Sequence, residues 1–311
     1  MLASLGYRAL QVSGVTTLAR RFSSGGVILC YHNVVAGTGA SPPPNGGLGL
    51  HMPLPTFERQ IRWLGQNYEV VSLSEFVTRS ARAGALRGVA AVTFDDGYAG
   101  VFDHAWPLLQ ALSIPATVFV VAEAPGGDDG FWWDDPEVLR VYSPERRQRW
   151  LGTLAGDGTT IVESLSATLR APPATCRPQA PPWCRSATWQ AIRAAAEAGL
   201  QLGVHSATHR SLPTLDELNL RREVVESRDA MRRHTGVTAE FFAYPYGLWD
   251  DRVRDALRTA GYRAAFTLEY GLHPATADPW ARPRVNVPAG IEDAAFQAWT
   301  AGLKLRRGHA P

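Results

Sequence analysis

Short apolar runs alternate with amphipathic stretches along most of the chain, and this alternation predicts its fold. Seven runs are hydrophobic at nearly every position, as expected of strands buried on both faces: 27–31, 89–94, 116–121, 200–204, 240–244, 263–267 and 284–287. Six stretches between them have the apolar spacing of helices: 57–67, 73–83, 100–112, 189–198, 215–234 and 250–260. Such alternation indicates an α/β fold with a parallel sheet. About seven units favour a complete or incomplete barrel, and a doubly wound open sheet is the alternative.

Glycines and capping residues mark the ends of several predicted helices. Gly199, Gly236 and Gly261 each follow a periodic stretch and are expected to close it. Thr214 followed by Glu217 is a capping-box pattern, which predicts the start of the 215–234 helix.

Two segments interrupt the alternation. Residues 36–55 form a loop rich in glycine and proline. Residues 122–185 begin with glycine and aspartate, end with prolines and contain a helical stretch at 135–150. A stretch of this length without a strand pattern is too long for a plain loop, so we expect an inserted lid or subdomain. Because it starts where the 116–121 strand ends, it should pack beside the face of the barrel at which the parallel strands end.

The first 24 residues predict an amphipathic helical segment. They hold Arg8, Arg20 and Arg21 around a weakly apolar stretch that makes a poor signal peptide. The segment could cover the barrel or touch a membrane surface, and no window of the chain reaches the roughly 18–20 apolar residues of a membrane span. We therefore expect a helical segment at 1–26, one main domain at 27–300 and a tail at 301–311. The expected location is cytoplasmic or peripheral to the inner membrane.

The composition is that of an ordinary globular protein. Of the 311 residues, 45% are hydrophobic and 19% charged, which excludes a disordered, collagenous or coiled-coil chain. The net charge of +2, from 31 basic and 29 acidic residues, gives no support for a nucleic-acid surface. Three cysteines are too few for a disulfide scaffold. Cys30 lies in an apolar run, whereas Cys176 and Cys184 could pair or remain two loop thiols.

Polar side chains follow four of the predicted strands. His32 comes after the first strand, Asp95 and Asp96 after the second, His205 after the fourth, and Tyr246 lies just beyond the fifth. The carboxyl ends of parallel strands meet at one face of a barrel, where barrel active sites are found. These side chains should therefore lie close together.

Three residues at these strand ends have the composition of a metal site. His205 and His209 are four residues apart, so on a helical turn both imidazoles would reach one ion. Side chains alternate along a strand, so Asp96 can be a ligand while Asp95 performs acid–base chemistry. Two histidines and a carboxylate with one open position are typical of a catalytic divalent ion. A helix N-cap for the aspartates and a structural histidine pair are the alternatives.

The other histidines and the tryptophans give weaker signals. The histidines that follow no strand end are interpreted as surface or packing residues: His51, His104, His234, His273 and His309. Trp132 and Trp133, inside the insertion, could stack on sugar rings or anchor the insertion to the barrel. These two and Tyr246 are the candidates for substrate contact.

Together these motifs resemble those of the polysaccharide deacetylase family, the NodB-homology or carbohydrate esterase 4 group. Residues 93–97 match its TFDDG motif, residues 205–209 match its HSxxH motif, and residues 242–247, FAYPYG, look like its third motif. The likeness runs from about residue 27 to 287 and is greatest to the exopolysaccharide, or poly-N-acetylglucosamine, branch. It implies a distorted (β/α)7 barrel with an inserted lid or subdomain, and a hydrolase that removes N-acetyl groups from an amino-sugar glycan and releases acetate.

The resemblance also implies a role for each motif residue. Asp96, His205 and His209 would hold one divalent metal ion, usually zinc. Asp95 would be the general base that takes a proton from the attacking water. The backbone N–H of Tyr246, with the metal, would stabilise the oxyanion.

Two departures from the family pattern affect the remaining roles. Many members carry an arginine in the third motif and a C-terminal Leu-x-His whose histidine protonates the leaving amine, and this chain has neither. His32, in a YHNV sequence like the N-terminal motif of the poly-N-acetylglucosamine branch, would replace that acid. Arg284, or its rival Arg282, would orient Asp95.

The sequence therefore predicts a metal-dependent N-deacetylase, bacterial in origin, with its catalytic domain at 27–300 and an N-acetylated cell-surface or exported glycan as its partner. A metal amidohydrolase acting on a small cyclic amide or ureide is the first alternative, and it would need a closed pocket instead of an open groove. A carbohydrate-binding module without catalysis is the second, which the complete set of motif residues argues against.

Overall fold

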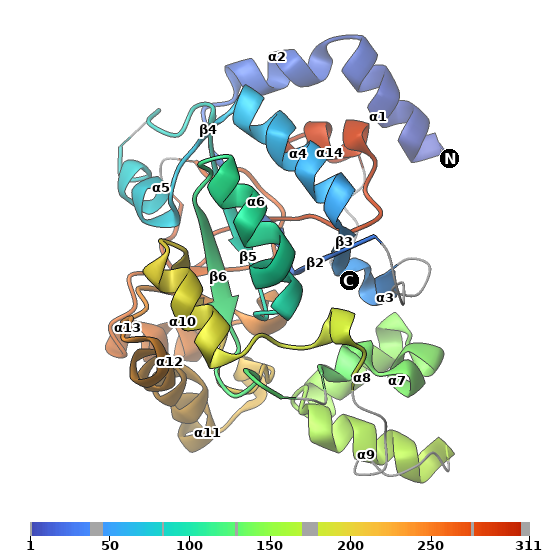
Figure 1. Cartoon of the computed structure of the whole chain (residues 1–311), viewed down its shortest axis with the longest axis vertical. Coiled ribbons are helices and arrows are strands. Elements are labelled where there is room, and N and C mark those ends of the chain that lie inside the picture. The colour runs from blue at the N-terminus through green and yellow to red at the C-terminus, as the bar shows by residue number, and fades with distance from the viewer. Residues whose placement is uncertain are drawn as a thin grey trace.

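The computed structural model describes residues 2–37, 46–82, 84–127, 130–169, 180–274 and 277–305. Its strands are β1 (Val27–Tyr31), β2 (Asn33–Val35), β3 (His51–Pro53), β4 (Glu69–Val70), β5 (Val89–Phe94), β6 (Ala116–Val120), β7 (Gln201–Val204), β8 (Phe241–Ala243), β9 (Ala264–Phe266) and β10 (Val285–Asn286). Its α-helices are α1 (Leu2–Val12), α2 (Val15–Phe22), α3 (Gly46–Gly49), α4 (Leu54–Asn67), α5 (Leu73–Arg79), α6 (Trp106–Ala111), α7 (Pro136–Val141), α8 (Pro144–Thr153), α9 (Gly158–Leu169), α10 (Trp189–Glu197), α11 (Glu217–Arg221), α12 (Ser227–Thr235), α13 (Asp251–Thr259) and α14 (Asp293–Thr300). Figure 1 shows helices arranged around a central sheet.

One curled parallel sheet organises the molecule. Its strands run in the order β10-β1-β5-β6-β7-β8-β9, with β4 paired to β5 off this path. The strands on the path correspond to the seven apolar runs, although several are shorter than predicted. Arg282 links the β9 and β10 edges through backbone hydrogen bonds with Ala265 and Thr267. The α/β fold with a distorted, incomplete barrel is thereby confirmed, and the doubly wound open sheet is excluded.

Alternation along the strands divides their side chains between the barrel interior and the surrounding helices. The interior cluster contains strand residues of one parity packed with residues of α5: Ile28, Val89, Ala91, Phe119, Phe241, Ala243, Ala264 and Phe266 on the strands, and Leu73, Phe76 and Val77 on the helix. Gly203 is required here, because a Cβ at this position would lie 2.4 Å from the Phe119 ring. The same parity, continued past the ends of β1 and β5, turns His32 and Asp95 inward.

The helix boundaries confirm the glycine stops and correct the cap. Gly236 ends α12 with a φ of 77°, and Gly199 and Gly261 are also left-handed just after their helices. The predicted cap at Thr214 is wrong. Asp216 caps α11 by accepting a hydrogen bond from the backbone N–H of Asn219, whereas Thr214 lies in the preceding 3-10 turn.

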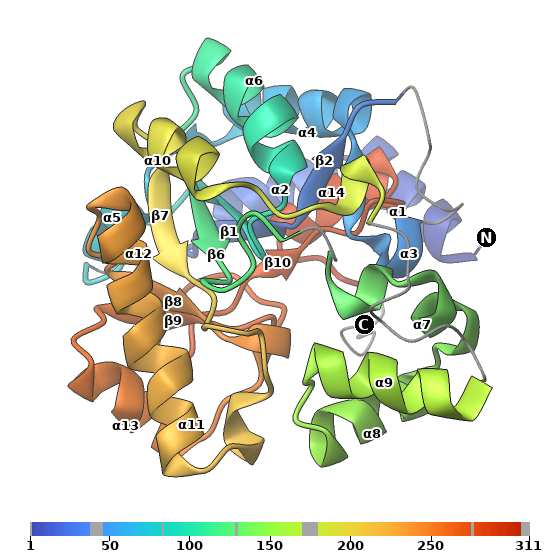
Figure 2. The ribbon, with the colours of Figure 1, turned by 60° about the horizontal axis from the view of Figure 1, so that its bottom comes forward.

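The insertion and the N-terminal helices lie in different parts of the molecule. Helices α7, α8 and α9 of the insertion form a group on the side toward which β6 and β7 point (Figure 2). Helices α1 and α2 lie at the top of Figure 1, where Tyr7 packs on Ala294 and Ala298 of α14. Among the described residues no helix is both long and apolar enough to cross a bilayer. Cys176, His309 and most of the 301–311 tail lie outside the described residues, so the pairing of Cys176 with Cys184 stays a prediction.

Candidate active site

Three donor atoms converge at the carboxyl end of the barrel. Asp96 follows β5, and His205 and His209 follow β7. The two histidine Nε2 atoms are 3.1 Å apart, and each lies 3.4 Å from Asp96 Oδ1. Ligands about 2.0–2.1 Å from one tetrahedral zinc ion lie about 3.3 Å from one another. The three atoms therefore have the spacing of three corners of such a site, with the fourth corner left open, and the donor set fits a divalent ion.

The two histidines are held in different ways. The Nδ1 of His205 bonds to the carbonyl oxygen of Ala243 at 2.8 Å, which leaves Nε2 with the lone pair. Burial alone would lower the pKa of His205, but Asp95 and Asp96 raise it. For His209, burial and the charge of His205 lower the pKa to about 3, so its ring stays neutral, the form that ligates metals.

The loop that carries the histidines is not a helical turn, so that prediction is wrong. Ser206 and His209 adopt left-handed φ values of 66° and 60°. Glu223 holds the loop, because its buried carboxylate accepts the backbone N–H groups of Ala207 and Thr208 at 2.9 Å each. Glu223 belongs to a π-helical segment, Arg222–Glu226, inside the predicted 215–234 helix, and such segments are frequent at functional sites. No spacing rule links this glutamate to the histidines, so its role could not be predicted from the sequence.

Strained backbone is concentrated at the site. Of the six non-glycine residues with positive φ among those described, four belong to the strand-end loops: Asp96, Ser206, His209 and Tyr246. Each such residue costs about 1–3 kcal/mol and persists only where its surroundings enforce it. The loops are therefore shaped to place these side chains at the expense of local backbone energy.

A fully buried ion pair lies beside the donor triangle. Arg284 Nη1 and Nη2 donate to Asp95 Oδ1 and Oδ2 at 2.7 Å each, and both residues are at most 1% exposed. Burial by itself would raise the pKa of Asp95, but Arg284 and His205 hold it well below its usual value, so the carboxylate is ionised. Arg282, the rival arginine, does not contact Asp95 and donates instead to the Ser80 hydroxyl.

His32 faces the same side of the barrel. A ring nitrogen of His32, the Cys30 sulfur and a carboxylate oxygen of Asp95 lie within 4.8 Å of one another. Burial lowers the pKa of His32, although Asp96 and Asp95 act in the opposite direction. Cys30 is buried as predicted, and its thiol also lies 3.4 Å from Asp95 Oδ2, a contact that the sequence did not predict.

The three donor residues, Asp95 and His32 line a small cavity of about 60 Å³. Besides the predicted residues it is lined by a few that carried no sequence signal: Leu48, Leu50, Arg147, Leu268 and Asn286. They come from α3 and the residue after it, from α8, from the segment after β9 and from β10. The insertion therefore contributes to the wall of the site through Arg147, Trp132 and Trp133.

Trp132 and Trp133 of the insertion are buried beside this cavity. Trp132 Nε1 donates to the Tyr246 hydroxyl at 3.2 Å. Trp133 is 4% exposed, stacks on Phe131 with 4.7 Å between ring centroids, and lies 4.5 Å from the His209 ring. With Phe131 over one face and His209 nearby, Trp133 offers no free face to a sugar ring. Of the two alternatives left open by the sequence, this geometry favours the anchor.

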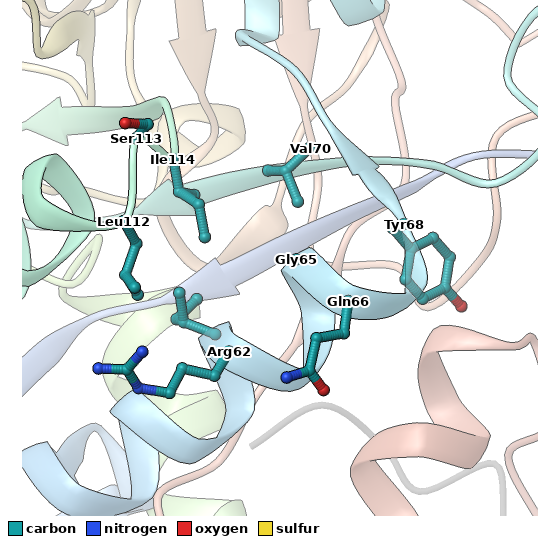
Figure 3. A pocket seen from close by; sticks show the side chains of 9 residues that line it. Arg62, Gly65, Gln66, Tyr68, Val70, Leu112, Ser113 and Ile114 are labelled. Carbon is teal, nitrogen blue, oxygen red and sulfur yellow. The ribbon is translucent and has the colours of Figure 1, made fainter.

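A larger hollow elsewhere has no comparable chemistry. It measures about 380 Å³ and lies between α4 and the turn before β6, where Arg62, Gln66 and Ser113 line it (Figure 3). Of the residues that line it, none is a histidine, a cysteine or a carboxylate. We therefore place the candidate site in the smaller cavity.

Sequence comparisons match this chain to polysaccharide deacetylases. The family model described as polysaccharide deacetylase matches residues 84–265. YxkH of Bacillus subtilis, a protein assigned to polysaccharide deacetylases, is 20% identical over 281 residues, which cover 89% of this chain and 76% of YxkH. The poly-β-1,6-N-acetyl-D-glucosamine N-deacetylase of Escherichia coli K12 is 28% identical over 226 residues. That match covers 68% of this chain but only 30% of the enzyme.

Solved structures share the fold. IcaB from Ammonifex degensii superposes with a TM-score of 0.61 at 21% identity, over 90% of this chain and 98% of that one. The BpsB deacetylase domain from Bordetella bronchiseptica gives a TM-score of 0.54 at 20% identity, over 84% and 95% of the two chains. At these identities the likeness establishes the architecture of the curled parallel sheet.

Proposed function

The chain belongs to the polysaccharide deacetylase family, and from this premise we propose that it is a zinc-dependent N-deacetylase of an amino-sugar glycan made for the cell surface or for export. Membership of the family makes it a deacetylase that hydrolyses an acetylated glycan. The metal and the sugar are the finer part of the proposal. One observation carries it: the donor triangle of Asp96, His205 and His209 and the Asp95–Arg284 pair meet at one small cavity.

In this proposal the two adjacent aspartates have separate tasks. Asp96, His205 and His209 hold the ion, which when bound lowers the pKa of water towards about 7 and polarises the acetyl carbonyl. Asp95 accepts the proton of the attacking water. Arg284 holds both oxygens of that carboxylate, which keeps it ionised and aimed.

Two further groups act on the other atoms of the amide. The backbone N–H of Tyr246 donates to the oxyanion that develops on the acetyl oxygen. His32 donates a proton to the departing nitrogen, which allows the carbon–nitrogen bond to break and releases acetate and a free amine.

The size of the cavity supports a glycan substrate. A volume of about 60 Å³ is far below the roughly 300–1,000 Å³ of pockets that enclose a whole small ligand. In our proposal the acetyl group enters, against Trp132 and Trp133, while the sugar lies across the mouth. The closed pocket that a small cyclic amide would need is not favoured. The E. coli relative acts by name on poly-β-1,6-N-acetyl-D-glucosamine, which makes this polymer the first substrate to test.

The direct test is acetate and free-amine release from β-1,6-linked N-acetylglucosamine oligomers. Activity should disappear after treatment with a chelator and return when zinc is added back. Release that is unaffected by chelation would refute the metal-dependent mechanism. Absence of release from any N-acetylated oligosaccharide by the zinc-loaded protein would refute the proposed substrate class.

The ion pair beside the site gives a prediction about stability. Replacing Arg284 by methionine should lower the free energy of unfolding by about 3–5 kcal/mol, because Asp95 would be left buried and unpaired. The pKa of Asp95 should rise, since the guanidinium that lowers it is gone. Asp95 in the wild type stabilises the fold above its unfolded pKa and loses this contribution as pH falls through its lower folded pKa. The variant should therefore lose stability and activity at a higher pH than the wild type, as measured by denaturant unfolding and pH–rate profiles.

Arg282→Met is the matched control for this prediction. Arg282 is also buried, two residues away, but donates to Ser80 and not to Asp95. It should leave the acidic limb of the pH–rate profile in place. The double variant Arg284→Met, Asp95→Leu should recover part of the lost stability, because it removes both charges. An Arg284→Met variant with unchanged stability and pH profile would contradict the assignment.

The N-terminal helices support a second part of the proposal, contact with an anionic membrane surface. Residues 1–24 contain three arginines and no acidic residue. Arg8 and Arg21 are exposed, as is a set of large apolar side chains on α1 and α2: Leu5, Val12, Val15, Leu18 and Phe22. An exposed apolar face next to basic residues is typical of helices that lie in the membrane interface.

This contact predicts binding to vesicles that contain anionic lipids. The protein should co-sediment with phosphatidylglycerol vesicles more than with phosphatidylcholine vesicles, and salt should weaken the binding. The double variant Leu18→Ser, Phe22→Ser should bind several-fold less. Leu218→Ser, on α11 and 78% exposed, removes an apolar side chain elsewhere and should have no effect. Equal binding by all three proteins would exclude the helix face as the contact.

A further inference from the structure

A buried hydrogen-bond network lies outside the proposed catalytic residues and ends at Trp133, whose ring contacts the ring of His209. Asp134 of the insertion accepts from Tyr98 at Oδ2, at 2.6 Å, and bonds to His51 Nε2 at Oδ1, at 2.8 Å. His51 Nδ1 accepts from the Asn33 side-chain amide at 3.0 Å, so Nε2 carries the hydrogen that Asp134 accepts. Asn33, His51, Tyr98 and Asp134 are all buried.

The network fixes the indole of Trp133. Its Nε1–H donates to the Tyr98 hydroxyl at 2.8 Å, and this hydroxyl in turn donates to Asp134. Phe131 stacks on Trp133 with its ring only 5° from parallel. The indole therefore has a hydrogen bond at its edge and a ring against its face, which together leave it one orientation.

His209 is the candidate ligand whose orientation most needs such support. The other histidine, His205, is fixed by the hydrogen bond from its ring to Ala243. His209 Nδ1 is buried and has no hydrogen-bond partner among the described residues. Its ring is instead confined by aromatic neighbours, Trp133 and Tyr246, each with its centroid at 4.5 Å. A shift of Trp133 would therefore release the ring of His209.

We propose that His51, Tyr98 and Asp134 are positioning residues that act through Trp133 to hold the His209 ring, and so set the affinity of the site for its metal. This inference rests on the proposed metal site. It gives a role to the Trp-Trp-Asp sequence at 132–134 of the insertion. The Asp134 carboxylate joins the insertion to His51 of β3 and to Tyr98, two residues after Asp96. Partners of this kind, which orient a ligand without touching the ion, typically change metal affinity by about 10–100-fold when removed.

Tyr98→Phe is the sharpest variant, because it removes one hydroxyl and both hydrogen bonds that pass through it. The dissociation constant for Zn²⁺ should be measured on the whole protein by competition with a chromophoric chelator. We expect binding about 10–100-fold weaker than in the wild type. At saturating zinc kcat should return close to the wild-type value, since none of the network residues performs a chemical step.

Tyr262→Phe is the matched control. Its hydroxyl donates to the carbonyl oxygen of Val224 at 3.0 Å, and Tyr262 is 5% exposed but does not line the cavity. Its zinc affinity should equal that of the wild type. Should Tyr98→Phe fail to fold, Asp134→Asn provides the test, since the amide oxygen can still accept one of the two hydrogen bonds and an intermediate loss of affinity is expected.

Three outcomes overturn the inference, and they can be told apart. Wild-type affinity in Tyr98→Phe and Asp134→Asn, with zinc binding abolished by His205→Ala, removes the network from the metal site and leaves the proposed function intact. Zinc binding that is undetectable in the wild type, or unchanged by His205→Ala, refutes both. Equal weakening by Tyr98→Phe and Tyr262→Phe would reduce the effect to a general loss of stability.

Discussion

Replacing His205 with alanine is expected to abolish metal binding and with it nearly all deacetylation. The triangle of donor atoms has edges of only 3.1–3.4 Å, so each atom contributes to one small site. Removing one imidazole leaves a carboxylate and one histidine, which cannot complete three corners of a tetrahedron. Zinc affinity should fall by more than the roughly 10–100-fold that follows loss of an outer partner. Elemental analysis after dialysis, together with acetate release, measures both effects.

His234→Ala is a suitable control for the loss of a histidine as such. The ring of His234 stacks on Trp189 of α10, away from the cavity, and should not affect zinc content. A His205→Ala protein that keeps full zinc occupancy would show that the zinc ion binds outside the triangle of Asp96, His205 and His209. A protein that loses zinc yet keeps its turnover would separate the metal from the reaction.

The fold was predictable because its main elements are encoded locally. The core strands are buried on both faces, so β1 and β5 appear in the sequence as unbroken apolar runs with the boundaries that the structure has. The placement of Asp95, Asp96 and His205 together followed from the same pattern, since parallel strands bring their carboxyl ends to one face. The alternation of apolar and amphipathic stretches could not predict the backbone conformation of the loops between a strand end and the next helix.

The histidine loop shows why that conformation escaped prediction. An i, i+4 spacing suggests a helical turn, but Ser206 and His209 are left-handed and the loop is irregular. This shape is enforced by a tertiary contact, because the Glu223 carboxylate accepts hydrogen bonds from the backbone N–H groups of Ala207 and Thr208. The Nε2 atoms of His205 and His209 still lie 3.1 Å apart. The turn of the irregular loop brings them together, and helical periodicity is not needed.

The buried network around Asp134 was beyond sequence reasoning for a related reason. His51 and Asp134 are 83 positions apart, and each by itself is an unremarkable polar residue next to a loop. His51 was expected to be a surface or packing residue; it is buried, but its partner Asp134 could not be named from the sequence. Only the folded insertion brings that carboxylate to the strand ends, and so links a segment with no strand pattern to the chemistry of the barrel.

His32 provides the second prediction of large effect. Amide cleavage needs a proton on the departing nitrogen, since the intermediate otherwise returns to substrate. His32 lines the cavity, and a ring nitrogen lies within 4.8 Å of an Asp95 oxygen. The alternative is that His32 merely packs at the end of β1. If His32 is the acid, His32→Ala should lower kcat by about 10²–10⁴-fold while the zinc content stays at the wild-type level.

The pH dependence separates an acid from a packing residue. Burial lowers the pKa of His32, so its protonated form becomes scarcer as the pH rises above that lowered value. Turnover by the wild type should therefore decline on the alkaline side of its pH–rate profile. In His32→Ala no such proton is available at any pH, so this decline should vanish from the residual activity.

His32→Gln distinguishes proton transfer from hydrogen bonding. Glutamine fills similar space and can donate a hydrogen bond, but it cannot transfer a proton to the leaving amine. An acid role requires that His32→Gln be as slow as His32→Ala, with both variants retaining zinc. Recovery of turnover by glutamine would make His32 a substrate-orienting residue, and loss of zinc in proportion to activity would make it a support for the metal ligands. Near-normal turnover in both variants would remove it from the mechanism, and the proton would then have to come from Asp95 after it has accepted one from the attacking water.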